Sequence, residues 1–191
     1  MICDERKLCF VHIPKCAGTT ITRLLDFKSK SVEHRTLRAY TNKRGYEDMN
    51  TLFKFCFVRN PWDRLVSWYY YHSESIYKPR TQKMFRSWVS RGCPHHWKKM
   101  FMDDVDWSKD NPLNLHSWLT PVGPIQFDKI FKTEEYDYAV EFLNDMLGLN
   151  LRNITFNKST RADYRHYYDA ATVQKVYELF PDDIDRFGYE F

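Results

Sequence analysis

The residues best suited to chemistry lie near the beginning of the sequence, in the stretch HIPKCAGTT over residues 12–20. Lys15 offers a positive charge, and Gly18 offers backbone freedom. Thr19 and Thr20 offer hydroxyl groups. At the start of a helix, these groups and the exposed backbone N–H groups would form a site for a phosphate-sized anion. The stretch is not a Walker A loop, because Lys15 precedes its glycine, and taken alone it also fits an ordinary strand-to-helix turn with a surface lysine.

A second set of polar residues follows an apolar run further along the chain. Arg59 ends this run, and Ser67 lies eight residues later, about two turns into the expected helix. The planar guanidinium of arginine makes bidentate contacts with phosphate, and a serine hydroxyl adds a directed donor. The pair therefore suits a second anion, although Arg59 could instead pair with Asp63 at the start of the helix.

Both sets of polar residues lie where a strand is expected to give way to a helix. Residues 8–13 are mostly apolar and rich in strand-forming side chains, until Pro14 interrupts them. Thr19 and Thr20 can cap the helix that follows. Residues 53–58 form a nearly continuous apolar run, which is typical of a strand buried on both faces of a parallel sheet.

The rest of the chain continues this alternation. The further elements expected are a helix beginning at Asn60 and Pro61, an amphipathic helix over 81–91, a strand over 126–133 with a helix that Gly148 ends, and a last helix from Asp169 to Leu179. Residues 28–44 are dense in charge and are expected to form a loop and a short helix over 36–40, outside the core. Alternating strands and helices predict an α/β protein, a three-layer α/β/α domain with a central parallel sheet. Ligands of such sheets bind at the carboxyl ends of the strands, which Lys15 and Arg59 both follow.

Length and composition limit the classes of partner. The 191 residues fit a single domain over 1–191, with an aromatic and basic insert around 73–124. The formal net charge of +4 and the absence of a dense Lys/Arg run argue against nucleic acid as a partner. The sequence shows no signal peptide and no apolar run of about 18 residues, so we expect no membrane anchor. The five cysteines lack paired C-x-x-C spacing, which predicts reduced thiols, no disulfide and a cytoplasmic location.

The insert holds aromatic and basic residues that allow two interpretations. They could form a surface that stacks sugar rings or holds anionic groups, or a loop-rich cap over the core. Cys93, His95 and His96 lack the second ligand pair of a zinc site, and no carboxylate cluster suggests magnesium, so no metal is expected. The residues concerned are His95, His96, Trp97, Lys98, Lys99, Trp107, His116 and Trp118.

The two sets of polar residues resemble the nucleotide-binding segments of sulfotransferases that use 3′-phosphoadenosine 5′-phosphosulfate (PAPS). HIPKCAGTT is similar to the 5′-phosphosulfate loop of carbohydrate-type enzymes and of small bacterial or viral members. Arg59 and Ser67 match the 3′-phosphate segment residue for residue, and residues 167–191 are similar to the tail of small members. The resemblance implies the P-loop-like sulfotransferase fold.

The resemblance also implies roles for individual residues. Lys15 would act in catalysis near the bridging oxygen of the phosphosulfate. His34 would be the general base, because His34-Arg35-Thr36 is similar to a histidine and threonine that small PAPS-dependent enzymes carry in this interval. The next candidates for the base are His72, His95, His96 and His116. The nucleotide-binding residues would be Lys15, Cys16, Ala17, Gly18, Thr19 and Thr20 at the 5′-phosphate, Arg59 and Ser67 at the 3′-phosphate, and Lys158, Ser159 and Arg161 in a basic loop that closes over the nucleotide.

These roles describe an enzyme that moves a sulfuryl group from PAPS to a hydroxyl acceptor and releases 3′-phosphoadenosine 5′-phosphate (PAP) without a metal. A carbohydrate is the leading class of acceptor. One alternative is a nucleotide or small-molecule kinase with an atypical phosphate loop, which would need Mg²⁺ and a Walker-type lysine. Another is a non-catalytic module that binds nucleotides or polysaccharides. The identity of the acceptor and the oligomeric state stay open.

Overall fold

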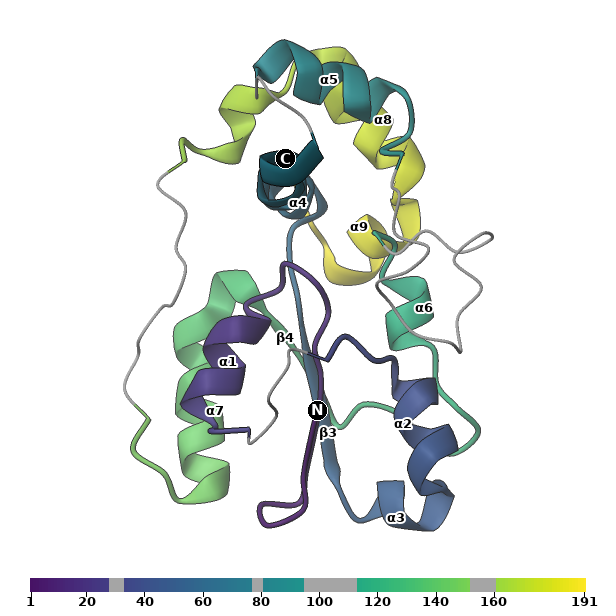
Figure 1. Ribbon diagram of the computed structural model, residues 1–191, viewed down its shortest axis with the longest axis vertical. Coiled ribbons are helices and arrows are strands. Elements are labelled where there is room, and N and C mark those ends of the chain that lie inside the picture. The colour runs from purple at the N-terminus through teal and green to yellow at the C-terminus, as the bar shows by residue number, and fades with distance from the viewer. Residues whose placement is uncertain (28–32, 77–80, 95–112, 152–160) are drawn as a thin grey trace. The chain divides into compact units, whose positions relative to one another are not determined.

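The computed structural model (Figure 1) shows a mixed α/β protein and describes residues 1–27, 33–76, 81–94, 113–151 and 161–191. The chain divides into two compact units, each built from two separate segments. The first unit consists of Met1–Val58 and Lys98–Lys158, and the second consists of Arg59–Trp97 and Ser159–Phe191. The single domain expected from the chain length stays a prediction.

Among the described residues of the first unit, four strands form one sheet. Their spatial order is β1 (Ile2–Cys3), β2 (Leu8–Val11), β3 (Phe53–Val58) and β4 (Lys129–Lys132). The pairs β2–β3 and β3–β4 are parallel, as predicted, whereas β1 pairs antiparallel with β2. The sheet is therefore mostly parallel, with one antiparallel strand at its edge. That strand was not predicted, because a two-residue strand is too short to show an apolar pattern.

Aromatic side chains fill the core of this sheet. Phe10 of β2 stacks on Phe55 of β3 with ring centroids 5.0 Å apart, and Phe57 of β3 lies 5.2 Å from Phe131 of β4. None of these four side chains is more than 2% exposed. Such burial confirms that β2 and β3 are interior strands of a sheet covered on both faces.

Helices lie on both sides of the sheet in Figure 1, with α1 and α7 on one side and α2 and α3 on the other. The described helices of this unit are α1 (Gly18–Leu24), α2 (Leu37–Arg44), α3 (Tyr46–Asn50), α6 (His116–Leu119), the 3-10 helix η1 (Thr133–Glu135) and α7 (Tyr136–Leu147). Gly148 ends α7, as predicted, and it adopts the left-handed conformation.

The segment around α2 belongs to the core, so the prediction that it lies outside is wrong. Leu37 and Tyr40 are 0% and 3% exposed. Thr36 caps the helix by accepting a backbone N–H at 3.1 Å. The many charged residues of this segment conceal an apolar side, because Leu37 and Tyr40 recur at helical spacing. The helix also extends to Arg44, beyond the expected end at residue 40.

The described part of the second unit is helical, and aromatic rings fill its core. Its elements are α4 (Pro61–Ile76), α5 (Gln82–Ser90), the 3-10 helix η2 (Tyr164–Tyr167), α8 (Ala170–Leu179) and α9 (Pro181–Phe187). Phe85 packs edge-on against Tyr168 and Tyr69, with centroids 5.0 and 5.3 Å apart. Asn60 and Asp169 cap α4 and α8 as expected, because backbone N–H groups at the helix starts bond their side chains. Thr81 caps α5 in the same way, although no cap was predicted there.

Six of the eight aromatic and basic residues named for the insert lie outside the described residues. Of its described members, Trp118 is fully buried and His116 is exposed. Trp118 therefore belongs to the core, where it cannot stack on a sugar. For this tryptophan the interpretation as a cap over the core is the one that fits.

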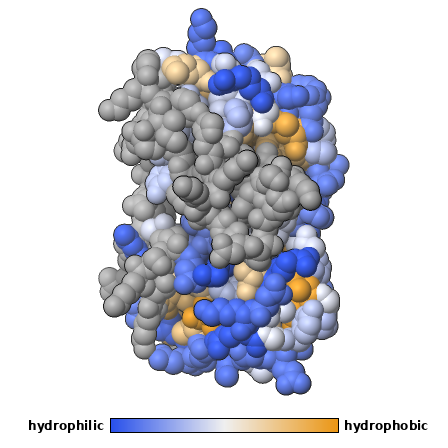
Figure 2. Space-filling view, turned by 45° about the vertical axis from the view of Figure 1, so that its right-hand side comes forward, coloured by the Kyte–Doolittle hydropathy of each residue, from blue (hydrophilic) through white to orange (hydrophobic). Residues whose placement is uncertain are grey.

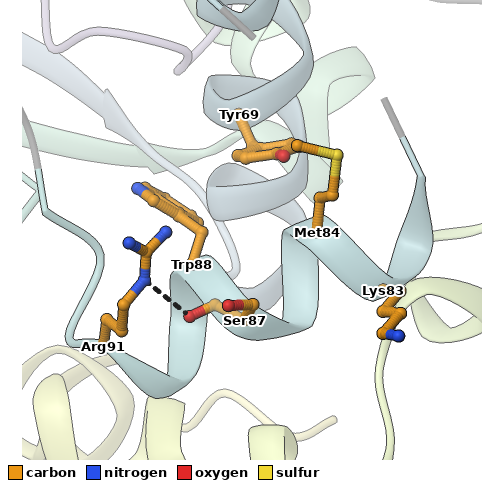
Figure 3. Close-up of a pocket in the computed structure, with 6 residues that line it drawn as sticks. All are labelled: Tyr69, Lys83, Met84, Ser87, Trp88 and Arg91. Carbon is orange, nitrogen blue, oxygen red and sulfur yellow. Dashed lines mark hydrogen bonds between the residues drawn. The ribbon is translucent and has the colours of Figure 1, made fainter. Parts of the chain in front are cut away.

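The described surface, helices and cysteines can be compared with the expectations about membrane anchoring and disulfides. In Figure 2, most described residues of the visible face are hydrophilic, and apolar residues show only in small areas. No helix within the described ranges is long and apolar enough to cross a membrane. All five cysteines are described, and no disulfide joins them. The cytoplasmic location stays a prediction.

Candidate functional site

The loop between β2 and α1 carries the first expected anion site, and two of its residues have an unusual backbone. Lys15 and Ala17 have φ angles of 65° and 56°. This left-handed region costs a residue with a side chain about 1–2 kcal/mol. Gly18 does not adopt it, so the prediction that Gly18 provides backbone freedom is wrong. Strained residues of this kind gather at functional sites, where the surrounding structure holds them.

Glycine is required at position 18 because a side chain there would have no room. A Cβ atom at this position would lie 1.7 Å from Cδ2 and Nε2 of His12. The His12 side chain is only 3% exposed. A residue without a side chain thus allows the imidazole to lie directly against the start of α1. Sequence reasoning missed His12, whose signal is a polar residue at the end of an apolar strand run.

Helix α1 starts earlier than predicted, at Gly18. Ala17 is its N-cap, and Thr19 and Thr20 lie inside the first turn, so the expected threonine caps are wrong. The N–H groups of Thr20 and Ile21 bond the carbonyl of Ala17 at 3.0 and 3.2 Å. The backbone N–H groups of Gly18 and Thr19 bond no backbone oxygen among the described residues. These two N–H groups can therefore bind an anion.

Lys15 and Cys16, the other expected residues of the loop, differ in exposure. The thiol of Cys16 is buried and donates to the carbonyl of Pro14 at 3.6 Å. Cys16 could therefore contact a nucleotide only through its backbone. Lys15 is half-buried.

His34 lies next to His12, and therefore next to the loop, although 22 residues separate the two histidines. Nδ1 of His34 is 2.8 Å from the backbone oxygen of His12, and the two ring centroids are 4.3 Å apart. A carbonyl oxygen only accepts hydrogen bonds, so Nδ1 carries the hydrogen and Nε2 of the neutral ring is the proton acceptor. The structure thus brings the expected base to the expected loop. Its catalytic role stays a prediction.

Burial keeps the imidazole of His12 neutral. Burial lowers the pKa of His12 well below its ordinary value of 6.5, and the positive charges of His34, the amino group of Met1 and Lys15 lower it further. Nδ1 of His12 has no hydrogen-bond partner among the described residues. The buried ring therefore adds no second positive charge beside His34.

Two expected phosphate-binding residues of the second unit share one carboxylate. Oδ2 of Asp63 accepts from Nε of Arg59 at 2.8 Å and from Nη2 of Arg59 at 2.6 Å. Oδ1 of Asp63 pairs with Arg161, which lies 98 residues further along the chain. The pairing of Arg59 with Asp63 that the sequence left open is therefore present. It does not exclude anion binding, because two cations share a single negative charge.

Arg59, Asp63 and Arg161, here named the arginine cluster, are partly shielded from water. Their side chains are 22%, 21% and 14% exposed. Charges interact more strongly at such positions than on an open surface, and a ligand can still reach them. Ser67, the other expected 3′-phosphate residue, is half-buried further along α4.

Hydrogen bonds fix the start of α4, next to Arg59 and Asp63 of the arginine cluster. Nδ2 of Asn60 donates to the carbonyl of Glu190 at 2.8 Å, while its Oδ1 caps α4. The hydroxyl of Tyr168 donates to the carbonyl of Trp62 at 2.9 Å. The tail and the η2–α8 segment thus hold the start of α4, which positions Arg59.

Several expected site residues lie outside the described part of the chain. They are Lys158, Ser159, His95, His96 and the side chain of His72. His116, the remaining candidate base, lies exposed at the start of α6. Within the described ranges, no three His, Cys, Asp or Glu side chains are grouped to hold a metal ion. Independence from metals stays a prediction.

Known proteins with similar sequences identify the family. The sequence model of the sulfotransferase family matches residues 1–190. Carbohydrate sulfotransferase 11 of Mus musculus and its counterpart in Rattus norvegicus are each 22% identical to the chain over 231 residues. These matches cover 97% of the chain, which spans 65% of the length of each relative. Because the family match extends over nearly every residue, the chain belongs to the sulfotransferase family.

Proposed function

We propose that the protein is an enzyme that transfers the sulfuryl group of PAPS to a hydroxyl group of a carbohydrate and releases PAP. The observation that carries the proposal is the placement of His34, whose Nδ1 lies 2.8 Å from the His12 carbonyl at the loop that holds Lys15. Membership of the family supports PAPS as the donor. The names of the two relatives support a carbohydrate as the acceptor.

The reaction needs a base and a group that stabilises the leaving oxygen. The acceptor oxygen attacks sulfur, and the bond between sulfur and the bridging phosphate oxygen breaks. Nε2 of His34 takes the hydroxyl proton, because Nδ1 is bound to the carbonyl. Lys15 stabilises the negative charge that develops on the leaving oxygen. As in phosphoryl transfer, positioning and electrostatics supply most of the rate.

PAPS carries two separate anionic ends, and the chain offers groups that suit each of them. The loop offers N–H groups and a lysine for the phosphosulfate. The arginine cluster offers guanidinium groups for the 3′-phosphate. We assign the 5′ end to Lys15, Cys16, Ala17, Gly18, Thr19 and Thr20, and the 3′-phosphate and its covering loop to Arg59, Ser67, Lys158, Ser159 and Arg161.

The fold expected of the family is part of the same proposal. We infer a three-layer α/β/α arrangement of the P-loop-like sulfotransferase type. Parallel pairing of β2, β3 and β4 supports it, as does the presence of helices on both sides of these strands (Figure 1). We also propose that catalysis needs no metal, since Lys15 and the arginines neutralise the phosphates.

The first test uses thermal unfolding to compare binding of PAP, the product of the proposed donor, with binding of ATP and Mg²⁺. PAP without metal should stabilise the protein by about 2.7 kcal/mol at a concentration of about 100 Kd. ATP with Mg²⁺ should stabilise it much less. Arg59→Ala should lose most of the effect of PAP, and Arg91→Ala, an exposed arginine after α5, should keep it. Stronger stabilisation by ATP with Mg²⁺ would favour a kinase instead.

The second test identifies the acceptor class. Labelled sulfate from PAPS is offered to a panel of oligosaccharides and polysaccharides and, separately, to phenols. We expect label on the sugars. Label on phenols alone would overturn the carbohydrate assignment, and PAP binding without transfer to any acceptor would leave a nucleotide-binding module.

A further inference from the structure

His12 has no part in the proposed chemistry, yet it lies at the centre of the contacts around the loop. One edge of its buried ring lies against Gly18, at the position where a Cβ atom would be. The ring stacks on Phe10 of β2 with centroids 5.7 Å apart, and lies 4.3 Å from the ring of His34. These contacts hold His12 between β2, the start of α1 and His34.

We propose that His12 is a positioning residue for His34, an inference that rests on the proposed function. Its carbonyl holds the Nδ1 hydrogen of His34, its ring supports the ring of His34, and Gly18 provides the space that the ring needs. The loop for the donor and the base for the acceptor are thus joined through one residue. A change at Gly18 therefore reaches His34 without touching it.

The carbonyl contact decides which nitrogen of His34 can accept a proton. With Nδ1–H bound to the carbonyl of His12 at 2.8 Å, the neutral ring carries no hydrogen on Nε2. If His12 moves, His34 can rotate or adopt the other tautomer, whose Nε2 carries a hydrogen and cannot act as a base. A misplacement of about 1 Å can lower a rate about 100-fold.

The role belongs to the shape of the His12 ring and to its main chain. The ring is buried, and burial together with the nearby positive charges keeps it neutral. Phenylalanine has a flat ring of similar size and the same backbone carbonyl. His12→Phe therefore keeps the support for His34, whereas His12→Ala removes the ring.

The first experiment reads the tautomer of His34 directly in the full chain without ligand. Nitrogen-15 NMR of the imidazoles should show hydrogen on Nδ1 of His34 at a pH where the ring is neutral. The His12→Phe variant should keep this signature, and His12→Ala should lose it. Unchanged His34 signals in His12→Ala would overturn the proposal.

The second experiment measures kcat and the KM for PAPS in a double-mutant cycle. His12→Ala should lower kcat about 10- to 100-fold and change KM less than about threefold, because the loop backbone still holds the donor. Gly18→Ala should lower kcat in the natural background, where its methyl group displaces the ring. In the His12→Ala background the methyl group has room, so Gly18→Ala should cost less than about twofold more. His166→Ala, an exposed histidine of η2, is the control and should leave both constants unchanged.

The outcomes separate this inference from the proposed function. Independent, multiplicative losses from His12→Ala and Gly18→Ala would overturn the link between the two residues. If the natural protein transfers no sulfate at all, the proposed function fails. The tautomer of His34 and the coupling between His12 and Gly18 in the free energy of unfolding still test the geometry in that case.

Discussion

The burial of His12 predicts that the protein loses stability in mild acid. Burial, followed by the charges of His34, the amino group of Met1 and Lys15, depresses the pKa of His12 in the folded protein well below 6.5. The unfolded chain therefore binds a proton that the folded protein rejects. The stabilisation is complete above about pH 6.5 and is lost as the pH falls toward the folded pKa.

The size of the effect follows from proton linkage. For an unfolded pKa of about 6.5 and a much lower folded pKa, the free energy of unfolding falls by about 1.2 kcal/mol between pH 7.0 and 5.5. The slope is about 1.2 kcal/mol per pH unit at pH 5.5 and approaches about 1.4 kcal/mol per pH unit at lower pH. His12→Phe has no proton to take up at this position, so its curve should be flatter by this amount.

Urea unfolding followed by tryptophan fluorescence measures the difference at several pH values in this range. The amino group of Met1, whose pKa burial lowers to about 5, titrates in both proteins, and its contribution cancels in the comparison. His34 and Lys15 are likewise present in both. Parallel curves for the natural protein and His12→Phe would refute the reasoning, because they would mean that His12 is protonated in the folded protein.

Three further predictions concern the phosphate and base residues. Arg59→Ala should weaken PAP binding by about 1.5–3 kcal/mol in calorimetry, and Ser67→Ala should weaken it less; unchanged affinity in folded Arg59→Ala would remove this arginine from the site. Asp63→Ala should lower the free energy of unfolding by about 1–3 kcal/mol in urea, because Arg59 and Arg161 lose their shared acceptor; an effect below about 0.5 kcal/mol, the level of ordinary surface changes, would contradict this. His34→Ala should lower turnover about 10²–10⁴-fold and leave PAP affinity nearly intact; near-normal turnover would assign the base to another group.

The elements with strong local signals were predictable from the sequence. Strands β2 and β3 are dense in apolar residues, and the caps at Asn60 and Asp169 act on N–H groups two or three residues away. The pairing of Arg59 with Asp63 was also foreseeable, because a side chain just before a helix lies close to an acidic residue in the first turn. Interactions within one helical turn or one strand can therefore be predicted from the sequence without knowledge of the fold.

Contacts between distant residues were not predictable in the same way. Arg161 was assigned to a loop over the nucleotide, yet nothing in the sequence pairs it with Asp63, 98 residues away. The contact of His34 with the His12 carbonyl depends on how the segment before α2 packs. That segment was expected outside the core, because its charged residues outnumber the buried Leu37 and Tyr40. Such contacts depend on packing, which local patterns do not encode.

In the loop from Pro14 to Gly18, the residue types did not predict the roles that these residues have in the structure. Glycine usually signals a left-handed backbone, but Lys15 and Ala17 adopt that conformation here, while Gly18 makes room for a side chain six residues earlier. An alanine at position 18 would fit the local backbone and still collide with His12. The constraint on this glycine is therefore tertiary. It places the start of α1 against the histidine whose carbonyl orients His34. In this loop the glycine makes room for a side chain, and its order relative to the lysine differs from that of a Walker A loop.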